Sequence, residues 1–418
     1  MLGALTFSAA SLVAAWSTSA EMLIGARALM GVGGATLMPS TLALVRNVFP
    51  DPRARSKAIG IWSAVMAGGI ALGPLPSGVM LEHVWWGAVF LVNVPVMGAL
   101  LIAAPLLLPE SHGDRRRIDV VSALLSLGAT LPFIYGVKDL AADGWSWEAA
   151  ASVAVGLLLA LAFVARQRTS SAPMLDLALF RNRGFSASVC INLIAQSALM
   201  GSSILITGYL QQVLGLRPFV AALWSVAPSL LVGGAAPLAA AIAGRIGRPP
   251  VMATGLGLGA AGFLPMNFVQ ADSSVWVCLG PTTMVAVGLV CVVTLVTEFV
   301  IGTVPAERAG AAAGFVETTS EFAGALGIAL FGSVVNAVYR LSMETGVPPG
   351  ITGAEAERAQ ETLVGALQVA ATDPSGPALL RAAEAAYVSG MHLAYVVGAV
   401  LMVVGVVVAL TRLPRQVA

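Results

Sequence analysis

Charged side chains are scarce in this sequence of 418 residues. Asp, Glu, Lys and Arg make up 10% of it, whereas soluble domains carry about 25%. Hydrophobic residues make up 58%, and the mean hydropathy is +0.89. This composition excludes an ordinary soluble domain and places most of the chain in lipid.

An excess of one charge sign is also lacking. The 22 basic and 21 acidic residues give a net charge of +1, so no overall field favours nucleic acid or an acidic partner. The three cysteines, Cys190, Cys278 and Cys291, lie in apolar runs without CxxC or Cys/His spacing. We therefore expect small buried hydrophobic residues there, and neither disulfides nor a metal site.

No arrangement of residues typical of an enzyme active site is recognisable in the sequence. His83, His112 and His392 fall at the ends of apolar runs, outside any HExxH or triad context. No nucleophile or phosphate-binding loop is recognisable either. The sequence predicts neither an enzyme nor a bound cofactor.

Long apolar runs are abundant. A bilayer core of about 30 Å needs about 20 mostly apolar residues per helix, and runs of this kind, bounded by charge, Pro or Gly, predict an all-α polytopic membrane protein with twelve spans. We place the spans at 1–17, 21–45, 57–81, 87–108, 119–138, 148–165, 185–209, 219–243, 250–269, 275–302, 313–338 and 387–411.

The first run has an alternative interpretation. Its apolar stretch ends in Ser17, Thr18, Ser19 and Ala20, which resembles a signal peptide with a small-residue cleavage site. A signal peptide needs a positively charged leader, and none precedes Leu2. We therefore keep the run as a span.

Basic residues indicate the orientation. With Met1 in the cytoplasm, the alternating loops place sixteen Lys and Arg inside. Only five fall outside, namely Lys138, Arg217, Arg340, Arg358 and Arg381. The positive-inside rule therefore predicts that both termini are cytoplasmic.

One polar insertion, at 340–385, interrupts the apolar pattern. It contains three arginines and six acidic residues, Ala354–Ala371 suits a helix, and prolines flank that stretch. We expect an outer loop with one exposed helix, acting as a solvated cap rather than as a binding module.

An arginine stands alone in the second apolar run. Placing Arg27 in a membrane helix costs about 2.5 to 3.5 kcal/mol, so it should face a partner or a water-filled path rather than snorkel from a helix end. Gly31 follows four residues later. This pair resembles the fourth-span motif of the major facilitator superfamily.

A Gly/Pro pattern marks the third run. Gly69, Gly73, Pro74 and Gly78 resemble the antiporter motif GxxxGPxxGG of the fifth span of drug:H+ antiporters, with Ser77 in place of one Gly. Glycine permits close backbone approach, and proline bends a helix. Further matches follow in the family's order: Pro173–Arg183, Gly208–Gly215, Ala243–Arg248 and Pro305–Gly327.

The chain thus resembles the 14-span drug:H+ antiporters of the major facilitator superfamily over nearly its whole length. The register implies that its twelve spans match the last twelve of fourteen, without the first two. Residues 1–110 would be a remnant of the first helical bundle, 111–183 a linker with two extra spans, and 184–418 the second bundle with the outer loop 340–385.

Two glutamates stand out near the start of the eleventh run. Glu317 and Glu321 are four residues apart and share one helix face. Because ionised carboxylates are costly in lipid, we expect them to point into the bundle and to exchange a proton for a cation. Quaternary-ammonium exporters of the family resemble the chain in carrying acids here. A solvated helix start is the alternative, and Glu298, close to a span end, is a further candidate.

Aromatic residues suggest a cavity for a lipophilic cation through stacking and cation–π contact. The candidates, together with one polar residue, are Trp62, Phe90, Tyr209, Gln211, Trp224, Phe315 and Phe322. Each taken singly also fits ordinary packing.

The resemblance implies a monomeric transporter in the cell membrane that exports hydrophobic, cationic drugs in exchange for protons by alternating access. Its partners would be the small-molecule substrate, protons and lipid, with no nucleic acid and no metal. Two alternatives stay open: export of an endogenous metabolite or antibiotic, and a truncated membrane protein that transports nothing.

Overall fold

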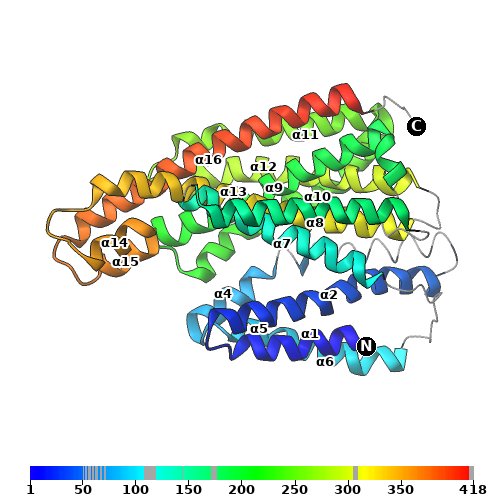
Figure 1. Ribbon diagram of the computed structural model, residues 1–418, viewed down its shortest axis with the longest axis horizontal. Coiled ribbons are helices and arrows are strands. Elements are labelled where there is room, and N and C mark those ends of the chain that lie inside the picture. Colours follow the sequence, from blue (N-terminus) through cyan, green and yellow to red (C-terminus); the bar gives the residue numbers. More distant parts are fainter. Residues whose placement is uncertain are drawn as a thin grey trace. The chain divides into compact units, whose positions relative to one another are not determined.

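The computed structural model describes most of the chain (Figure 1). Outside the described residues lie 50, 52–53, 55–57, 59–60, 62–64, 66–67, 70–71, 108–118, 144, 171–176, 305–308 and 414–418. Every regular element within the described part is a helix. The predicted all-α fold is confirmed.

The described helices fall into two units, separated by how their residues contact one another. The first comprises Met1–Arg117 and Arg217–Gly233, and the second Ile118–Leu216 and Gly234–Ala418. Helix α10 (Pro218–Ile246) belongs in part to each unit. The first unit otherwise holds α1 (Leu2–Ala15), α2 (Ala20–Val48), α4 (Pro74–His83), α5 (Ala88–Leu91) and α6 (Asn93–Leu107).

The second unit contains most of the described helices. In chain order they are α7 (Val120–Asp143), α8 (Trp147–Thr169), η1 (Leu177–Arg181), α9 (Arg183–Gly208), η2 (Tyr209–Val213), α11 (Arg248–Phe263), η3 (Pro265–Phe268), α12 (Val275–Gly302), α13 (Ala309–Gly346), α14 (Ala354–Glu361), α15 (Leu363–Ala370) and α16 (Gly376–Arg412).

Nine helices within the described residues are long and apolar enough to cross a membrane. They coincide with nine of the predicted spans, from the fourth to the twelfth. Of the other three, α1 is a shorter apolar helix, α2 covers the run 21–45, and α4 covers the end of the run 57–81. Ten of the 25 residues of that third run lie outside the described residues.

In the first unit, α1 packs against α2, α5 and α6. A Cβ atom on Gly33 of α2 would lie 2.8 Å from the backbone nitrogen of Phe7, so the glycine allows α1 and α2 to meet closely. Two hydrogen bonds pin α1 to later residues: Trp85 Nε1 donates to the carbonyl of Ala15 at 3.3 Å, and Asn93 Nδ2 donates to Ser11 Oγ at 3.3 Å.

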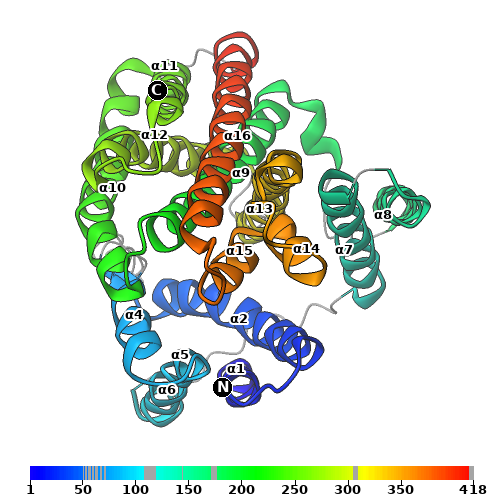
Figure 2. The ribbon, with the colours of Figure 1, turned by 90° about the vertical axis from the view of Figure 1, so that its left-hand side faces the viewer.

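The core of the second unit is formed by α9, α11, α12, α13 and α16, which pack side by side (Figure 2). Fully buried rings fill it: Phe263 lies 5.6 Å from Tyr395 and 6.4 Å from Phe331 between ring centroids. Cys278 is buried there as expected, but Cys190 is exposed, contrary to the prediction. Cys190 lies on the same exposed side of α9 as Ile204.

Helices α7 and α8, the predicted linker helices, form a hairpin attached to this core. Figure 2 shows α7 beside α13 and α8 on the far side of α7. Glycines make the hairpin tight, since a Cβ on Gly136 would lie 2.6 Å from the Ala149 carbonyl and one on Gly156 would lie 2.8 Å from the Ala129 carbonyl. The hairpin therefore belongs structurally with the second unit.

An ion pair closes the hairpin at its charged end. Arg166 Nη2 donates to Asp119 Oδ1 at 2.9 Å, and the hydroxyl of Ser122 donates to Asp119 Oδ2 at 2.6 Å. Gln167 Nε2 in turn donates to Ser122 Oγ at 2.8 Å. The hydrogen bonds from Arg166 and then Ser122 hold the pKa of the Asp119 carboxyl well below its ordinary value of 3.8.

The segment 340–385 differs from the single-helix loop expected. Helix α13 continues to Gly346 and α16 already begins at Gly376, and two helices, α14 and α15, join them with a break at Thr362 (Figure 1). The Thr362 hydroxyl accepts from the Gly365 nitrogen and so starts a new helix there. This segment is also packed, because buried Ala359, Leu363 and Ala366 face the unit.

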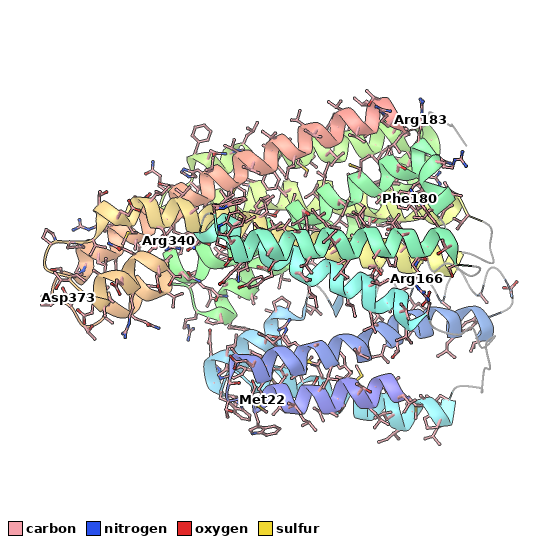
Figure 3. The ribbon with its side chains drawn as sticks, in the orientation of Figure 1. Met22, Arg166, Phe180, Arg183, Arg340 and Asp373 are labelled. Atoms are coloured by element: carbon pink, nitrogen blue, oxygen red, sulfur yellow. The ribbon has the colours of Figure 1, made fainter. Side chains whose placement is uncertain are left out.

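The two ends of the second unit carry different labelled residues. In Figure 3, Arg166 and Arg183 lie at one end, and Arg340 and Asp373 lie at the other. The alternation of the predicted spans also assigns these two pairs of residues to opposite sides of the membrane. The end that carries Arg183 is therefore the one predicted to face the cytoplasm.

Glycine is required at the turn into α11. Gly247 has φ 88° and ψ 159°, a backbone region open almost only to glycine. Next to it, the Arg248 guanidinium carbon lies 5.9 Å from the centre of the Phe299 ring on α12. The turn thereby fixes the side chain that contacts the neighbouring helix.

Replacing this glycine should destabilise the protein. We expect Gly247→Ala to cost about 1 to 3 kcal/mol of unfolding free energy, because alanine is strained at this φ. Thermal unfolding of the purified protein in detergent measures the loss. Gly244→Ala is the control, since a Cβ there meets no atom within 4 Å; equal effects of the two changes would contradict the argument.

The Asp119 ion pair predicts a pH dependence. Because the carboxyl pKa is lowered in the folded protein, the stabilisation is complete above 3.8 and is lost as pH falls through the lowered pKa. Asp119→Asn should therefore lower the unfolding temperature at neutral pH, with a difference from the wild type that shrinks in acid. Asp139→Asn, near the other end of α7, is the control. A difference that grows in acid would exclude this role.

Candidate functional site

The two predicted carboxylates lie one turn apart on α13. Glu317 and Glu321 are both exposed, on a stripe that also carries the exposed Gly314, Ala325 and Ile328. Neither glutamate has an ion-pair partner among the described residues. The sequence argument predicted that both point into the bundle; within the described part of the second unit they lie on an exposed face of α13.

Small residues on α13 explain this placement. Gly324 and Gly327 turn toward α9: a Cβ on Gly324 would lie 3.1 Å from Met200, and one on Gly327 would overlap the backbone of Ser197. Close packing uses the smallest side chains of a helix. Both glutamates lie on the adjoining side of α13. The helix therefore buries its glycines and leaves its carboxylates exposed.

Aromatic rings support α13 on either side of the pair. Phe315 stacks with Phe185 at 6.0 Å and meets Phe180 edge-on at 5.7 Å. Phe322 lies 6.2 Å from Phe133 of α7. Both predicted cavity residues on α13 are therefore half-buried and in contact with other rings.

The other predicted cavity residues are distributed over both units. Tyr209 is fully buried, and its hydroxyl donates to the Gln270 carbonyl at 2.7 Å, so it serves packing in this structure. Gln211, in the same π-helical turn, is exposed. Phe90 and Trp224 are half-buried in the first unit, and Trp62 lies outside the described residues.

The two remaining candidate charges lie apart from this site. Glu298 is exposed near the end of α12, without an ion-pair partner in the part of the chain that the structure describes. Arg27 is exposed on α2 of the first unit, and its guanidinium likewise forms no ion pair with a described residue.

The antiporter-type motif lies at the start of α4. Pro74 occupies the first turn, and the Gly73 nitrogen donates to the Gly69 carbonyl at 2.8 Å. Gly78 packs against the start of α10, where its Cβ would lie 2.7 Å from Phe219 Cα. Close backbone approach is thus found at Gly78, whereas a Cβ on Gly69 meets nothing within 4 Å.

A residue that the sequence argument did not single out completes this contact. Glu82, at the end of α4, accepts a hydrogen bond from the Phe219 nitrogen at 3.1 Å and lies 3.6 Å from Arg217. Its side chain is only 9% exposed. The sequence signal for this residue was its spacing, since Glu82 follows Gly78 by four residues and therefore lies on the same helix face.

Comparison with known proteins agrees with this architecture. The family model described as Major Facilitator Superfamily matches residues 1–328. The chain belongs to the Major Facilitator Superfamily. Members of this superfamily are transporters that move small molecules across membranes, and not enzymes, which agrees with the absence of any recognisable catalytic motif in the sequence.

Several relatives are named for drug efflux, drug resistance or antibiotic export. Multidrug efflux pump LfrA of Mycolicibacterium smegmatis is 40% identical over 406 residues, covering 96% of this chain and 80% of that protein. Methyl viologen resistance protein SmvA of Salmonella typhimurium is 32% identical, covering 93% and 79%. The tetracenomycin C resistance and export protein of Streptomyces glaucescens is 31% identical, covering 99% and 78%.

Solved structures show the same fold. A bacterial homolog of the human lysosomal transporter Spinster, inward-facing and unoccupied, matches with a TM-score of 0.52 at 16% identity, over 99% of this chain and 83% of that one. A structure from a study of proton dependent oligopeptide transporters matches with a TM-score of 0.51 at 17% identity, over 99% and 84%. The major facilitator fold predicted from the sequence is confirmed.

The contact at Gly78 gives a prediction. Gly78→Ala should cost about 1 to 3 kcal/mol of stability, because its methyl group meets backbone, which cannot rotate away. Thermal unfolding in detergent, with the amount of protein in the membrane, measures the effect. Gly69→Ala is the matched control from the same motif, and a Gly78→Ala protein as stable as this control would show that the contact does not matter.

Proposed function

We propose that this chain exports hydrophobic cations across the cell membrane in exchange for protons, by alternating access. The observation that carries the proposal is the pair Glu317 and Glu321, two exposed carboxylates one turn apart in a membrane-spanning helix without a cation partner among the described residues. Carboxylates in such a position are expensive to keep and are therefore expected to have a function.

The pair suits an exchange of one cation for another. Two negative charges one turn apart repel each other, and binding either a proton or a cationic substrate relieves that repulsion. The two ligands therefore compete for the same carboxylates. Inward movement of protons then drives outward movement of the substrate, with the electrical part of the gradient worth about 2.3 kcal/mol per charge per 100 mV.

The surroundings of the pair favour a lipophilic substrate. Phe315 and Phe322 flank the carboxylates on the same helix, and aromatic faces attract organic cations. The relatives point in the same direction: one is a multidrug efflux pump, and another is named for resistance to methyl viologen, an aromatic dication. We extend this substrate class to the present chain.

Orientation forms part of the proposal. Loops assigned to the cytoplasm by the alternation of spans carry sixteen Lys and Arg, against five on the other side. Both termini would then be cytoplasmic. We take the transporting unit to be a monomer.

Transport into inverted membrane vesicles tests the function. With an imposed pH gradient, uptake of ethidium or methyl viologen should fall about tenfold or more in Glu317→Gln and in Glu321→Gln, because neither amide can take up and release the proton. Glu148→Gln, an exposed acid in the first turn of α8, is the control and should transport normally. Equal uptake by all variants would refute the coupling role.

A second candidate is export of an antibiotic or another metabolite made by the host cell. It is favoured by the similarity to a tetracenomycin C resistance and export protein and to a probable actinorhodin transporter. Competition in the same vesicles separates the two candidates: neutral or anionic polycyclic compounds that block uptake better than quaternary ammonium compounds would favour metabolite export.

A further inference from the structure

Helix α9 carries three polar side chains at a spacing of four residues. Ser188, Asn192 and Gln196 follow one another along a single strip of the helix. The strip starts near the end of the second unit marked by Arg183 (Figure 3). At a rise of 1.5 Å per residue, it runs from about 8 Å to about 20 Å beyond Arg183, which is well inside a membrane span.

Ser188 and Asn192 are buried, Gln196 is half-buried, and all three side chains are incompletely bonded. Ser188 is 0% exposed and Asn192 is 2% exposed. The oxygens Ser188 Oγ, Asn192 Oδ1 and Gln196 Oε1 are buried without a hydrogen-bond partner among the described residues. A buried polar oxygen in a bundle surrounded by lipid is costly unless something donates a hydrogen bond to it.

Other serines on the same helix are satisfied. Ser197 Oγ donates to the Ala323 carbonyl at 2.7 Å, and Ser202 Oγ donates to the Leu199 carbonyl at 3.1 Å. The three unpaired oxygens are therefore a property of this strip rather than of α9 as a whole. All three accept hydrogen bonds, so the ligand that fits them is a small donor, and water is the donor that fits between packed helices.

One hydrogen bond links the strip to the carboxylate helix. Asn192 Nδ2 donates to Ser320 Oγ at 2.9 Å, and both residues are buried. Ser320 precedes Glu321 and lies within one turn of Glu317 on α13. Its own hydroxyl hydrogen is left to donate onward, because the asparagine occupies an acceptor position on the oxygen.

We infer that the strip Ser188, Asn192 and Gln196 holds a chain of buried water molecules that passes protons between the Arg183 end of the second unit and Glu317 and Glu321. Each water accepts one proton and donates another to the next water. A proton therefore enters at one end as a proton leaves at the other, and each water ends with the same two O–H bonds. The inference rests on the proton coupling proposed above, and it adds the route.

Apolar replacements of similar size test the route. The triple variant Ser188→Ala, Asn192→Leu and Gln196→Met removes every unpaired oxygen. Its unfolding temperature should stay close to that of the wild type, because removing buried acceptors without protein partners offsets the loss of the hydrogen bond from Asn192 to Ser320. Uptake of ethidium driven by a pH gradient should fall about tenfold or more. Exchange of labelled for unlabelled ethidium without a gradient should stay within about twofold, since the carboxylates remain.

Ser202→Ala is the matched control, because it removes a buried hydroxyl of α9 whose hydrogen bond is already made within the helix. If the triple variant does not fold, the single variant Asn192→Leu is measured in the same three assays, with the same expected pattern. A loss of both gradient-driven uptake and exchange would point to damage of the site rather than of a route, and would overturn the inference.

The remaining outcomes separate this inference from the proposed function. Normal gradient-driven uptake by the folded triple variant, together with loss in Glu317→Gln, would refute the water chain and leave proton coupling intact. Normal uptake by both variants would refute proton coupling itself. The inference predicts that gradient-driven uptake is lost in both the triple variant and Glu317→Gln, and that exchange is retained only in the triple variant.

Discussion

The close packing of α9 against α13 is the contact on which the rest of the second unit depends. Gly201, Gly324 and Gly327 bring the two backbones together, so closely that an added methyl group at any of them would meet neighbouring atoms. In a bilayer, where helices gain little by hiding apolar surface from one another, such fitting supplies much of their association. It also sets which side of α13 faces its neighbours.

Two consequences follow from that contact. The side of α13 that turns toward α9 carries Ser320 and meets Asn192, whereas the adjoining side keeps Glu317 and Glu321 uncovered. A buried polar strip and an accessible acidic pair thus lie on neighbouring faces of one helix. The proton–cation exchange proposed above calls for both environments, a narrow hydrated passage for protons and an open surface for a bulky cation.

The spans, the helical class and the position of the acidic pair were predictable from the sequence, because apolar length and residue spacing depend only on local composition. The burial of individual side chains was not predictable from the sequence. Glu317 is exposed and Tyr209 is fully buried, and residue spacing could decide neither, because burial depends on which helix packs against which face. Glu82 was overlooked for the same reason, since its partners Arg217 and Phe219 are distant in the sequence.

The joined helices α14 and α15 tie α13 and α16 together beyond the apolar spans. The Tyr339 hydroxyl of α13 donates to the Ala359 carbonyl of α14 at 2.8 Å, and α15 packs on α16. Two long helices bridged in this way cannot slide or spread at that end unless the bridge breaks. The bridge therefore couples the outer ends of α13 and α16 mechanically, so that neither helix can tilt at that end without the other.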